Sequence, residues 1–144
     1  MLANLNVWFT RLTDHPNLGK LLLRVTIAGL MLFHGIAKLQ GGVGWIGGML
    51  EANGYPAFIA YGAYIGEVIA PILIILGIFT RPMALVMAFN MLVATLMVNL
   101  GKLATLTQVG AWGMETDALF LFGALAITLL GSGRFSVMNN EAYR

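Results

Sequence analysis

Cysteine is absent from the 144-residue chain, and histidine occurs only twice, as His15 and His34. Without cysteine the chain can form no disulfide bond, no thiolate metal site and no thiol-based catalytic centre. The two histidines fall near opposite ends of one expected helix, nearly a membrane thickness apart at about 1.5 Å per residue. A haem ligated by two histidines of the same chain is therefore excluded. The chain also has no glycine-rich phosphate loop, no nucleophile elbow and no cluster of metal ligands, so we expect no metal site.

Charged side chains are also scarce, at 10% of the residues, whereas soluble domains carry about 25%. Hydrophobic residues make up 59% of the chain, and its mean hydropathy is +0.85. This composition predicts an integral membrane protein, and the length allows one domain. The isoelectric point of 9.2 would suit a nucleic-acid-binding protein, but the net charge is only +2 and the basic residues are scattered. We therefore expect no nucleic-acid partner.

Four apolar stretches dominate the sequence, each near the length of about 20 residues that a bilayer-spanning helix needs. Together they predict an all-α fold, a left-handed four-helix transmembrane bundle formed by one domain at residues 18–131. The spans are expected at 18–39, 57–79, 82–100 and 111–130. The glycine-rich segment 40–56 is expected at the membrane surface, because irregular backbone is not tolerated against lipid.

Shorter segments flank the bundle. Residues 1–17 carry four apolar side chains at i, i+3, i+4 and i+7, which predicts a short amphipathic helix lying in the membrane interface. These side chains are Leu5, Trp8, Phe9 and Leu12. Residues 132–144 form a polar tail.

The placement of lysine and arginine predicts the orientation of the bundle. One side of the membrane has only Lys38 and Lys102 near it. The other side receives most of the basic residues, namely Arg11, Lys20, Arg81, Arg134 and Arg144. The positive-inside rule places this basic side, and with it both termini, in the cytoplasm.

A carboxylate near the centre of the second span, Glu67, is the first candidate functional residue. An ionisable group at membrane depth costs at least a few kcal/mol, so it marks a functional site by default and requires a partner. Polar residues of the other spans fall where they could line one interior with it. The candidate ligand-binding residues are Glu67, His34, Lys38, Tyr64, Asn90, Arg24 and one of two acids at the start of the fourth span, Glu115 or Asp117.

Two cationic partners are about equally far from Glu67 along the membrane normal. At 1.5 Å per residue, Arg24 lies about 7 Å to the cytoplasmic side and His34 about 8 Å to the outer side. Side chains tilt toward the N-terminus of their own helix, so Arg24 points to the cytoplasm while His34 points back toward the centre. We therefore predict that Glu67 pairs with His34, with Lys38 one turn further out as a second cation.

Each candidate also has a purely structural interpretation. Lys38, Glu115 and Arg24 could snorkel to the membrane interface. Asn90 could hold two helices together by a hydrogen bond, and Glu67 could belong to an ion pair without function.

Three motifs stand out along the chain. The first motif is Leu21-Leu22-Leu23-Arg24 followed by His34-Gly35-Ile36-Ala37-Lys38-Leu39. The second is Glu67 with Leu76-Gly77-Ile78-Phe79-Thr80-Arg81-Pro82. The third is Gly131-Ser132-Gly133-Arg134-Phe135-Ser136. In order and spacing they resemble the DoxX family of small bacterial membrane proteins, and the resemblance covers residues 18–137. The chain departs from the family pattern at Met138, where an aspartate is common, so no role of a tail acid carries over.

The resemblance implies a four-helix protein of the bacterial inner membrane, associated with quinone or thiol redox chemistry and with oxidative stress. On this basis we expect a redox-associated protein that binds a quinone, or a similar apolar aromatic molecule, at a polar site centred on Glu67 and His34. It would act as a subunit of an oxidoreductase complex with a redox partner. Two alternatives stay open: a proton-coupled small-molecule exporter with Glu67 as proton carrier, and a structural or assembly subunit.

Self-association is also expected, because glycines let transmembrane helices approach closely. The glycines that suit this role are Gly29, Gly35, Gly62, Gly66, Gly77 and Gly123. The expected partners are therefore the lipid bilayer, a small apolar ligand, a redox subunit and further copies of the chain.

Overall fold

The computed structural model describes residues 1–144, and the chain is helical apart from its turns and one isolated β-bridge between Leu106 and Trp112. The prediction of an all-α fold is confirmed. The elements follow in the order α1 (Leu2–Thr13), α2 (Pro16–Gly41), α3 (Gly44–Ala52), η1 (Ala57–Tyr61), α4 (Gly62–Tyr64), η2 (Ile65–Ile69), α5 (Ala70–Leu76), α6 (Thr80–Ala94), η3 (Thr95–Asn99), η4 (Leu100–Lys102), α7 (Glu115–Leu130) and η5 (Glu141–Tyr143).

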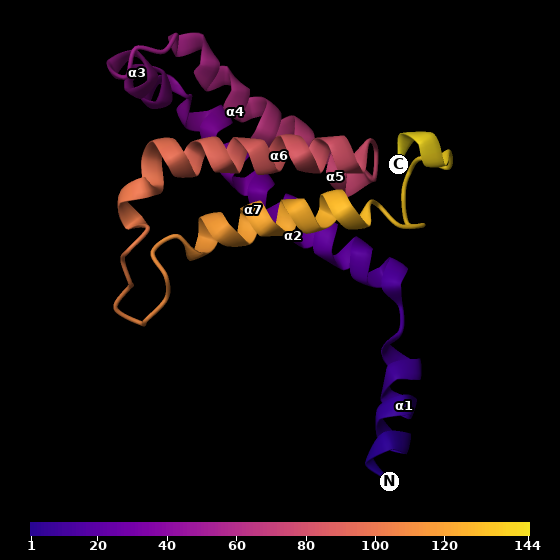
Figure 1. Cartoon of the computed structure of the whole chain (residues 1–144). Coiled ribbons are helices and arrows are strands. Elements are labelled where there is room, and N and C mark those ends of the chain that lie inside the picture. Colours follow the sequence, from indigo (N-terminus) through magenta and orange to yellow (C-terminus); the bar gives the residue numbers. More distant parts are fainter.

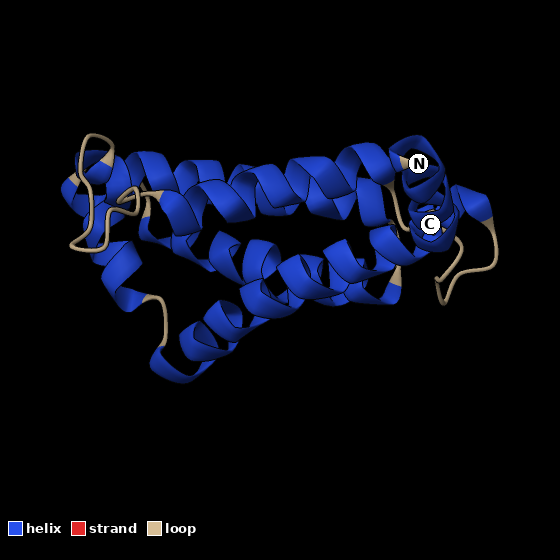
Figure 2. Cartoon of the chain, turned by 90° about the horizontal axis from the view of Figure 1, so that it is seen from below, coloured by secondary structure: helices blue, strands red, loops and turns tan.

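Four helical rods form the body of the molecule. Their connecting loops gather at its two ends (Figure 2). The rods are α2, the stretch from η1 to α5, the stretch from α6 to η4, and α7. Contacts join α2 to α5, α5 to α6, α6 to α7 and α7 back to α2, so the rods close into a ring. The chain is therefore a four-helix bundle.

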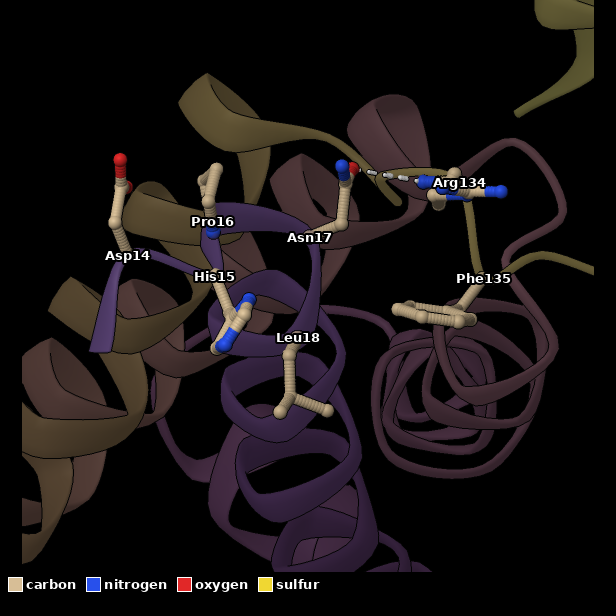
Figure 3. A pocket seen from close by; sticks show the side chains of 7 residues that line it. All are labelled: Asp14, His15, Pro16, Asn17, Leu18, Arg134 and Phe135. Carbon is tan, nitrogen blue, oxygen red and sulfur yellow. Dashed lines mark hydrogen bonds between the residues drawn. The ribbon is translucent and has the colours of Figure 1, made fainter. Parts of the chain in front are cut away.

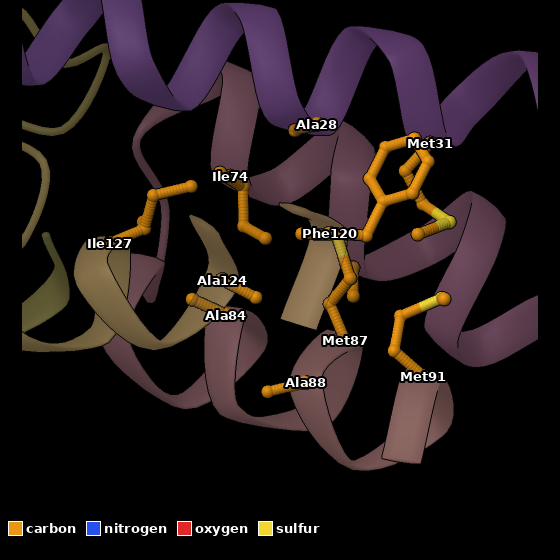
Figure 4. Close-up of a cluster of buried hydrophobic side chains, with 11 residues drawn as sticks. Ala28, Met31, Ile74, Ala84, Met87, Ala88, Met91, Phe120, Ala124 and Ile127 are labelled. Atoms are coloured by element: carbon orange, nitrogen blue, oxygen red, sulfur yellow. The ribbon is translucent and has the colours of Figure 1, made fainter. Parts of the chain in front are cut away.

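The core of the bundle is filled by small and flexible side chains (Figure 4). Its members come from all four rods and are Ala28, Met31, Ala70, Ile74, Ala84, Met87, Ala88, Met91, Phe120, Ala124 and Ile127. The alanines let the helix backbones approach closely, and the methionines fill the irregular gaps between them. Because lipid tails are as apolar as these side chains, close packing rather than the hydrophobic effect favours the cluster.

Three continuous helical stretches are long and apolar enough to cross a membrane: Pro16–Gly41, Ala57–Leu76 and Thr80–Lys102. The fourth rod differs from the expected span 111–130, because its helix begins only at Glu115. The preceding loop forms its own hydrogen bonds: the Ala111 carbonyl, which would accept from the Glu115 amide in a longer helix, accepts from the Thr107 amide at 2.8 Å. Trp112 donates its indole N–H to the carbonyl of Leu103 at 2.7 Å, and the Gly113 amide donates to Thr105 at 2.9 Å.

The second rod is not a uniform α-helix. It begins as a 3₁₀-helix at Ala57–Tyr61, contains a π-helical turn at Ile65–Ile69 and becomes an α-helix from Ala70. Pro71 has no N–H group, so it cannot donate to the carbonyl of Glu67 four residues earlier. The missing bond lies at the π turn, a kind of irregularity that is frequent at functional sites. The expected span 57–79 thus contains its main irregularity around Glu67.

The N-terminal helix α1 stands apart from the bundle and runs across its long axis (Figure 1). It has no buried residue, and its apolar side chains Leu5, Trp8, Phe9 and Leu12 are all exposed. An amphipathic helix in this direction can lie in the membrane surface while the bundle spans the bilayer. The expected N-terminal amphipathic helix is therefore present, and its position in the membrane interface stays a prediction.

The C-terminal tail returns to the end of the bundle at which α2 begins (Figure 1). The Gly77 backbone has a positive φ of 78°, which turns the chain sharply after α5. Ser136 donates its hydroxyl to the Gly77 carbonyl at 2.7 Å, and the Val137 amide donates to Leu76 at 3.0 Å. The tail thus caps the exposed carbonyls of α5.

Most of the glycines expected to mediate self-association pack inside one chain. A Cβ atom at Gly35, Gly66, Gly77 or Gly123 would meet another segment of the same molecule within 3 Å. Gly29 and Gly62 face open space. Self-association stays a prediction, and these two positions are the glycines available for it.

Candidate functional site

Glu67 is buried in the bundle, with 3% of its surface exposed, and its carboxylate binds two side chains from neighbouring rods. Lys38 of α2 forms a salt bridge in which its ammonium group contacts both carboxylate oxygens. Asn90 of α6 donates its side-chain N–H to Oε1 at 3.1 Å. A buried carboxylate is tolerated only when its charge is paired and its oxygens are hydrogen-bonded, and this arrangement meets both conditions.

Close backbone approach at two glycines positions the carboxylate. A Cβ atom at Gly35 of α2 would lie 2.1 Å from the Glu67 carbonyl oxygen. A Cβ atom at Gly66 would lie 2.4 Å from that of Asn90. Only glycine fits at both places, so α2 and α6 pack directly against the π turn. The carboxylate therefore lies where three rods meet.

Lys38 reaches Glu67 from near the end of α2. Its side chain is 21% exposed, whereas that of Glu67 is 4% exposed. Tyr64, one turn before Glu67, donates its hydroxyl to the Lys38 carbonyl at 3.2 Å. This bond ties the end of α2 to the second rod next to the ion pair.

The ion pair borders a cavity of about 230 Å³ in the half of the bundle near α3. Its walls combine the polar pair with aromatic and thioether side chains. The lining residues are Met31, His34, Lys38, Trp45, Glu67, Met91, Ala94, Val98, Asn99, Thr116, Asp117 and Phe120. Mostly apolar walls with a few convergent polar groups are typical of a small-molecule site.

A second polar contact lies on the same cavity. Asn99 of the π turn Thr95–Asn99 donates its side-chain N–H to Oδ2 of Asp117 at 2.7 Å. Asp117 belongs to the first turn of α7, where the helix dipole stabilises a negative charge. Of the two acids expected here, Asp117 lines the cavity, whereas Glu115 is exposed and lies outside it.

Glu67 and His34 do not form the predicted ion pair, because the carboxylate is bound by Lys38 and Asn90. The His34 ring stands edge-on to Phe120, with centroids 5.4 Å apart. The lysine side chain is longer than the imidazole and reaches back by one helical turn, which side-chain direction alone did not reveal. His34 still lines the same cavity as Glu67.

Arg24 lies elsewhere and is not a partner of Glu67. It is buried at the other end of α2, with 2% of its surface exposed. Its guanidinium group donates to the carbonyl of Ile74 at 3.3 Å and to that of Phe135 in the tail. Arg24 is among the expected ligand-binding residues, but it does not line the cavity beside Glu67; in this structure it joins α2, α5 and the tail.

Several cavity residues were not among the expected site residues. Trp45 comes from α3, a segment expected only at the membrane surface, and Phe120 comes from the middle of α7. Asn99 is a polar residue near the end of an apolar span, and this position is the signal that could have identified it as a cavity residue. The residues around Trp45 do not indicate whether its side chain lines a cavity or anchors the chain at the membrane interface.

The arrangement can orient a polar atom of a ligand within an apolar wall. Lys38 offers N–H donors, Glu67 offers acceptors, and His34 can do either. Aromatic rings of Trp45 and Phe120 offer stacking surfaces. No group of three histidine, aspartate and glutamate side chains is close enough to hold a metal ion.

Comparison with known proteins agrees with the motifs in the sequence. The family model described as DoxX matches residues 19–100, more than half of the chain. A protein of Bacillus subtilis (strain 168) named "Putative oxidoreductase CatD" is 34% identical over 128 residues, which are 88% of this chain and 89% of that protein. No solved structure matches the chain. The resemblance is confirmed, and the chain belongs to the DoxX family.

Proposed function

We propose that this protein binds a quinone, or a similar apolar aromatic molecule, in the cavity beside Glu67 and takes part in its reduction or oxidation. The observation that carries the proposal is the Lys38–Glu67 ion pair on an otherwise largely apolar cavity inside a membrane bundle. A quinone has the matching chemistry, since its ring is apolar and its carbonyl oxygens accept hydrogen bonds.

The walls of the cavity support a flat aromatic ligand. Trp45 and Phe120 can contact the faces or edges of a ring, and Met31 and Met91 adapt to its outline. The volume of about 230 Å³ is below the range of about 300–1,000 Å³ that is typical for drug-sized ligands. The cavity therefore suits one substituted ring, with any long apolar chain running into lipid.

The polar groups have distinct roles in this proposal. The Lys38 ammonium donates a hydrogen bond to a quinone oxygen, and it compensates the charge of Glu67 when the carboxylate is ionised. His34 and Glu67 are the groups that could exchange a proton with the ligand. Asp117, already bound to Asn99, marks the side of the cavity nearest to the start of α7.

Reduction of a quinone to a quinol consumes two electrons and two protons. The chain has no cysteine, and its residues offer no cluster of metal ligands. In this proposal a redox partner subunit therefore supplies or accepts the electrons, and the cavity residues transfer the protons. The name of the relative, an oxidoreductase, supports a redox role.

The proposed setting is the bacterial inner membrane with both termini in the cytoplasm. The basic residues near the start of α2, at the start of α6 and in the tail support this orientation. Association with further copies of the chain belongs to the same proposal, through surfaces such as those at Gly29 and Gly62.

The proposal is tested by extracting the protein together with its surrounding lipid and identifying quinones in the extract by mass spectrometry. Wild-type protein is expected to retain quinone above the level of the bulk membrane. Glu67→Gln and Lys38→Met are each expected to lower the retained amount about tenfold, the effect of losing one hydrogen bond with a charged group.

Lys102→Gln is the matched control, because Lys102 is an exposed cation outside the cavity. It is expected to retain quinone at the wild-type level. Absence of quinone from the wild type, together with efflux from vesicles that depends on a pH gradient and on Glu67, would instead identify a proton-coupled exporter.

A further inference from the structure

A second polar cavity lies at the opposite end of the bundle from the Glu67 site. Its volume is about 310 Å³, and it lies between the start of α2, the start of α6 and the tail after α7. Four cationic side chains line it, Lys20, Arg81, Arg134 and Arg144, against one carboxylate, that of Glu141. Four of the eight lysines and arginines in the chain thus share one cavity, with three more positive side chains than negative ones.

Two of these cations have no partner in the protein. The side chains of Lys20 and Arg134 form no hydrogen bond and no salt bridge, although both border the cavity. Arg134 is held only through its backbone amide, which donates to Oδ1 of Asn17 at 3.1 Å. Their charges are therefore available to an anion from outside the chain.

The other two cations are fixed in place by backbone carbonyls. Arg81 donates to Thr128 at 2.9 Å and to Leu129 at 2.7 Å, at the end of α7. Arg144 donates to Gly133 at 3.3 Å and pairs with Glu141. Because these bonds fix both guanidinium groups, the two side chains add positive charge at the cavity and are less flexible than free surface side chains.

An adjoining pocket is more apolar. It has a volume of about 390 Å³ and shares Asn17 and Arg134 with the cationic cavity. Figure 3 shows Leu18 and Phe135 on the side toward the helices, while Asp14 and Asn17 carry their polar groups at the opposite side. A cationic cavity beside an apolar one matches a phosphate group joined to acyl chains.

The depth of both cavities also suits a lipid headgroup. Lys20 lies in the first turns of α2, which begins at Pro16, and α1 leaves the bundle at this same end (Figure 1). An amphipathic α1 in the membrane surface brings Arg134 and Lys20 to the level of the phosphates. Basic pockets between transmembrane helices at this depth bind anionic lipid headgroups.

We propose that this end of the bundle is a binding site for an anionic phospholipid, whose phosphodiester contacts Lys20 and Arg134 while its acyl chains lie along Leu18 and Phe135. The site is independent of the Glu67 cavity and of any redox activity. Arg81 and Arg144 complete the positive field around the phosphate.

The test is a titration of the detergent-solubilised protein with phosphatidylglycerol, followed by native mass spectrometry. Phosphatidylglycerol is expected to bind with a stoichiometry of at least one, and phosphatidylcholine, which has no net charge, is expected to bind far more weakly. Lys20→Gln and Arg134→Gln are each expected to weaken binding about fivefold, and the double variant about 25-fold. The charge-conserving variants Lys20→Arg and Arg134→Lys are expected to bind almost as well as the wild type, provided that they elute as folded protein.

Lys102→Gln serves as the control for the loss of one positive charge at the other end of the bundle. Equal weakening by Lys102→Gln would overturn the proposal, because it would show a non-specific charge effect. Equal binding of both lipids would overturn it as well. Inorganic phosphate is the third arm: displacement of phosphatidylglycerol by millimolar phosphate would show a site for free phosphate instead of a lipid headgroup.

Discussion

Glu67 and Lys38 form a pair whose two members are unequally buried, since the carboxylate is enclosed and the ammonium group reaches it from the cavity side. The desolvation cost of such a pair is large, so removing one partner is more damaging than removing both. If Lys38 is removed, Asn90 compensates the buried carboxylate only in part, because it donates one hydrogen bond to one oxygen, Oε1. The pair therefore makes a clear prediction about combined substitutions.

Lys38→Met is expected to destabilise the protein by about 3 kcal/mol or more, because it leaves the Glu67 carboxylate buried without a cation. Glu67→Gln removes the charge but keeps an acceptor for Asn90, so its effect is expected to be smaller. The double variant Lys38→Met/Glu67→Gln is expected to be more stable than Lys38→Met alone. Thermal unfolding in detergent measures all three. Strictly additive effects would show that the two residues do not interact.

Ionisable and other polar residues inside apolar runs are easy to find in a sequence, so Glu67, Lys38 and Asn90 are candidates from the sequence alone. The choice between two cations on one helix was harder. His34 and Lys38 lie on adjacent turns of α2, and the outcome depends on side-chain length and on the edge-on contact of the His34 ring with Phe120. That contact joins residues far apart in the chain, so local pattern could not predict it.

At the level of elements, the π turn at Ile65–Ile69 is the feature that distinguishes the second rod from a plain spanning helix. A π turn holds an extra residue, which rotates the following side chains by about 100° relative to an unbroken α-helix. Along this rod Glu67 and Pro71 are buried, whereas Tyr61, which precedes the π turn, is exposed. The length of the apolar run predicts the rod, but it does not predict that the side chains after the π turn are rotated about the helix axis.

Gly35→Ala is expected to destabilise the bundle by about 1–3 kcal/mol, because the added Cβ would meet the Glu67 carbonyl and push α2 away from the π turn. Gly19→Ala is the matched control on the same helix, since its Cβ would meet nothing within 4 Å. There the better helix propensity of alanine is expected to stabilise by up to about 1 kcal/mol. Comparison of the two thermal midpoints checks the contact, and equal midpoints would contradict it.

The whole molecule has two ends of different chemistry. The end near α3 carries the cavity with Glu67, while the end near the tail collects most of the basic residues. The lengths of the apolar runs were sufficient to predict four rods and their order. They did not predict the late start of α7, because that depends on hydrogen bonds within the loop after η4, such as the one from Trp112 to Leu103.

The positive-inside rule predicts that the tail faces the cytoplasm and that the loop containing Lys102 faces outward. The absence of cysteine makes a direct test simple, since one introduced cysteine is the only reactive thiol. Lys102→Cys in intact cells is expected to react with a membrane-impermeant maleimide, and Asn140→Cys is expected to react only after lysis. The reverse pattern would show the opposite orientation.

The central claim, that the cavity beside Glu67 binds a quinone, can be measured through Trp45, which lines it. The chain has three tryptophans, so Trp8→Phe combined with Trp112→Phe leaves Trp45 as the single indole fluorophore. Titration with a short-chain quinone is expected to quench this fluorescence to saturation, with an affinity about tenfold weaker after Lys38→Met. Quenching that rises without saturation, and that is unchanged by Lys38→Met, would contradict the account.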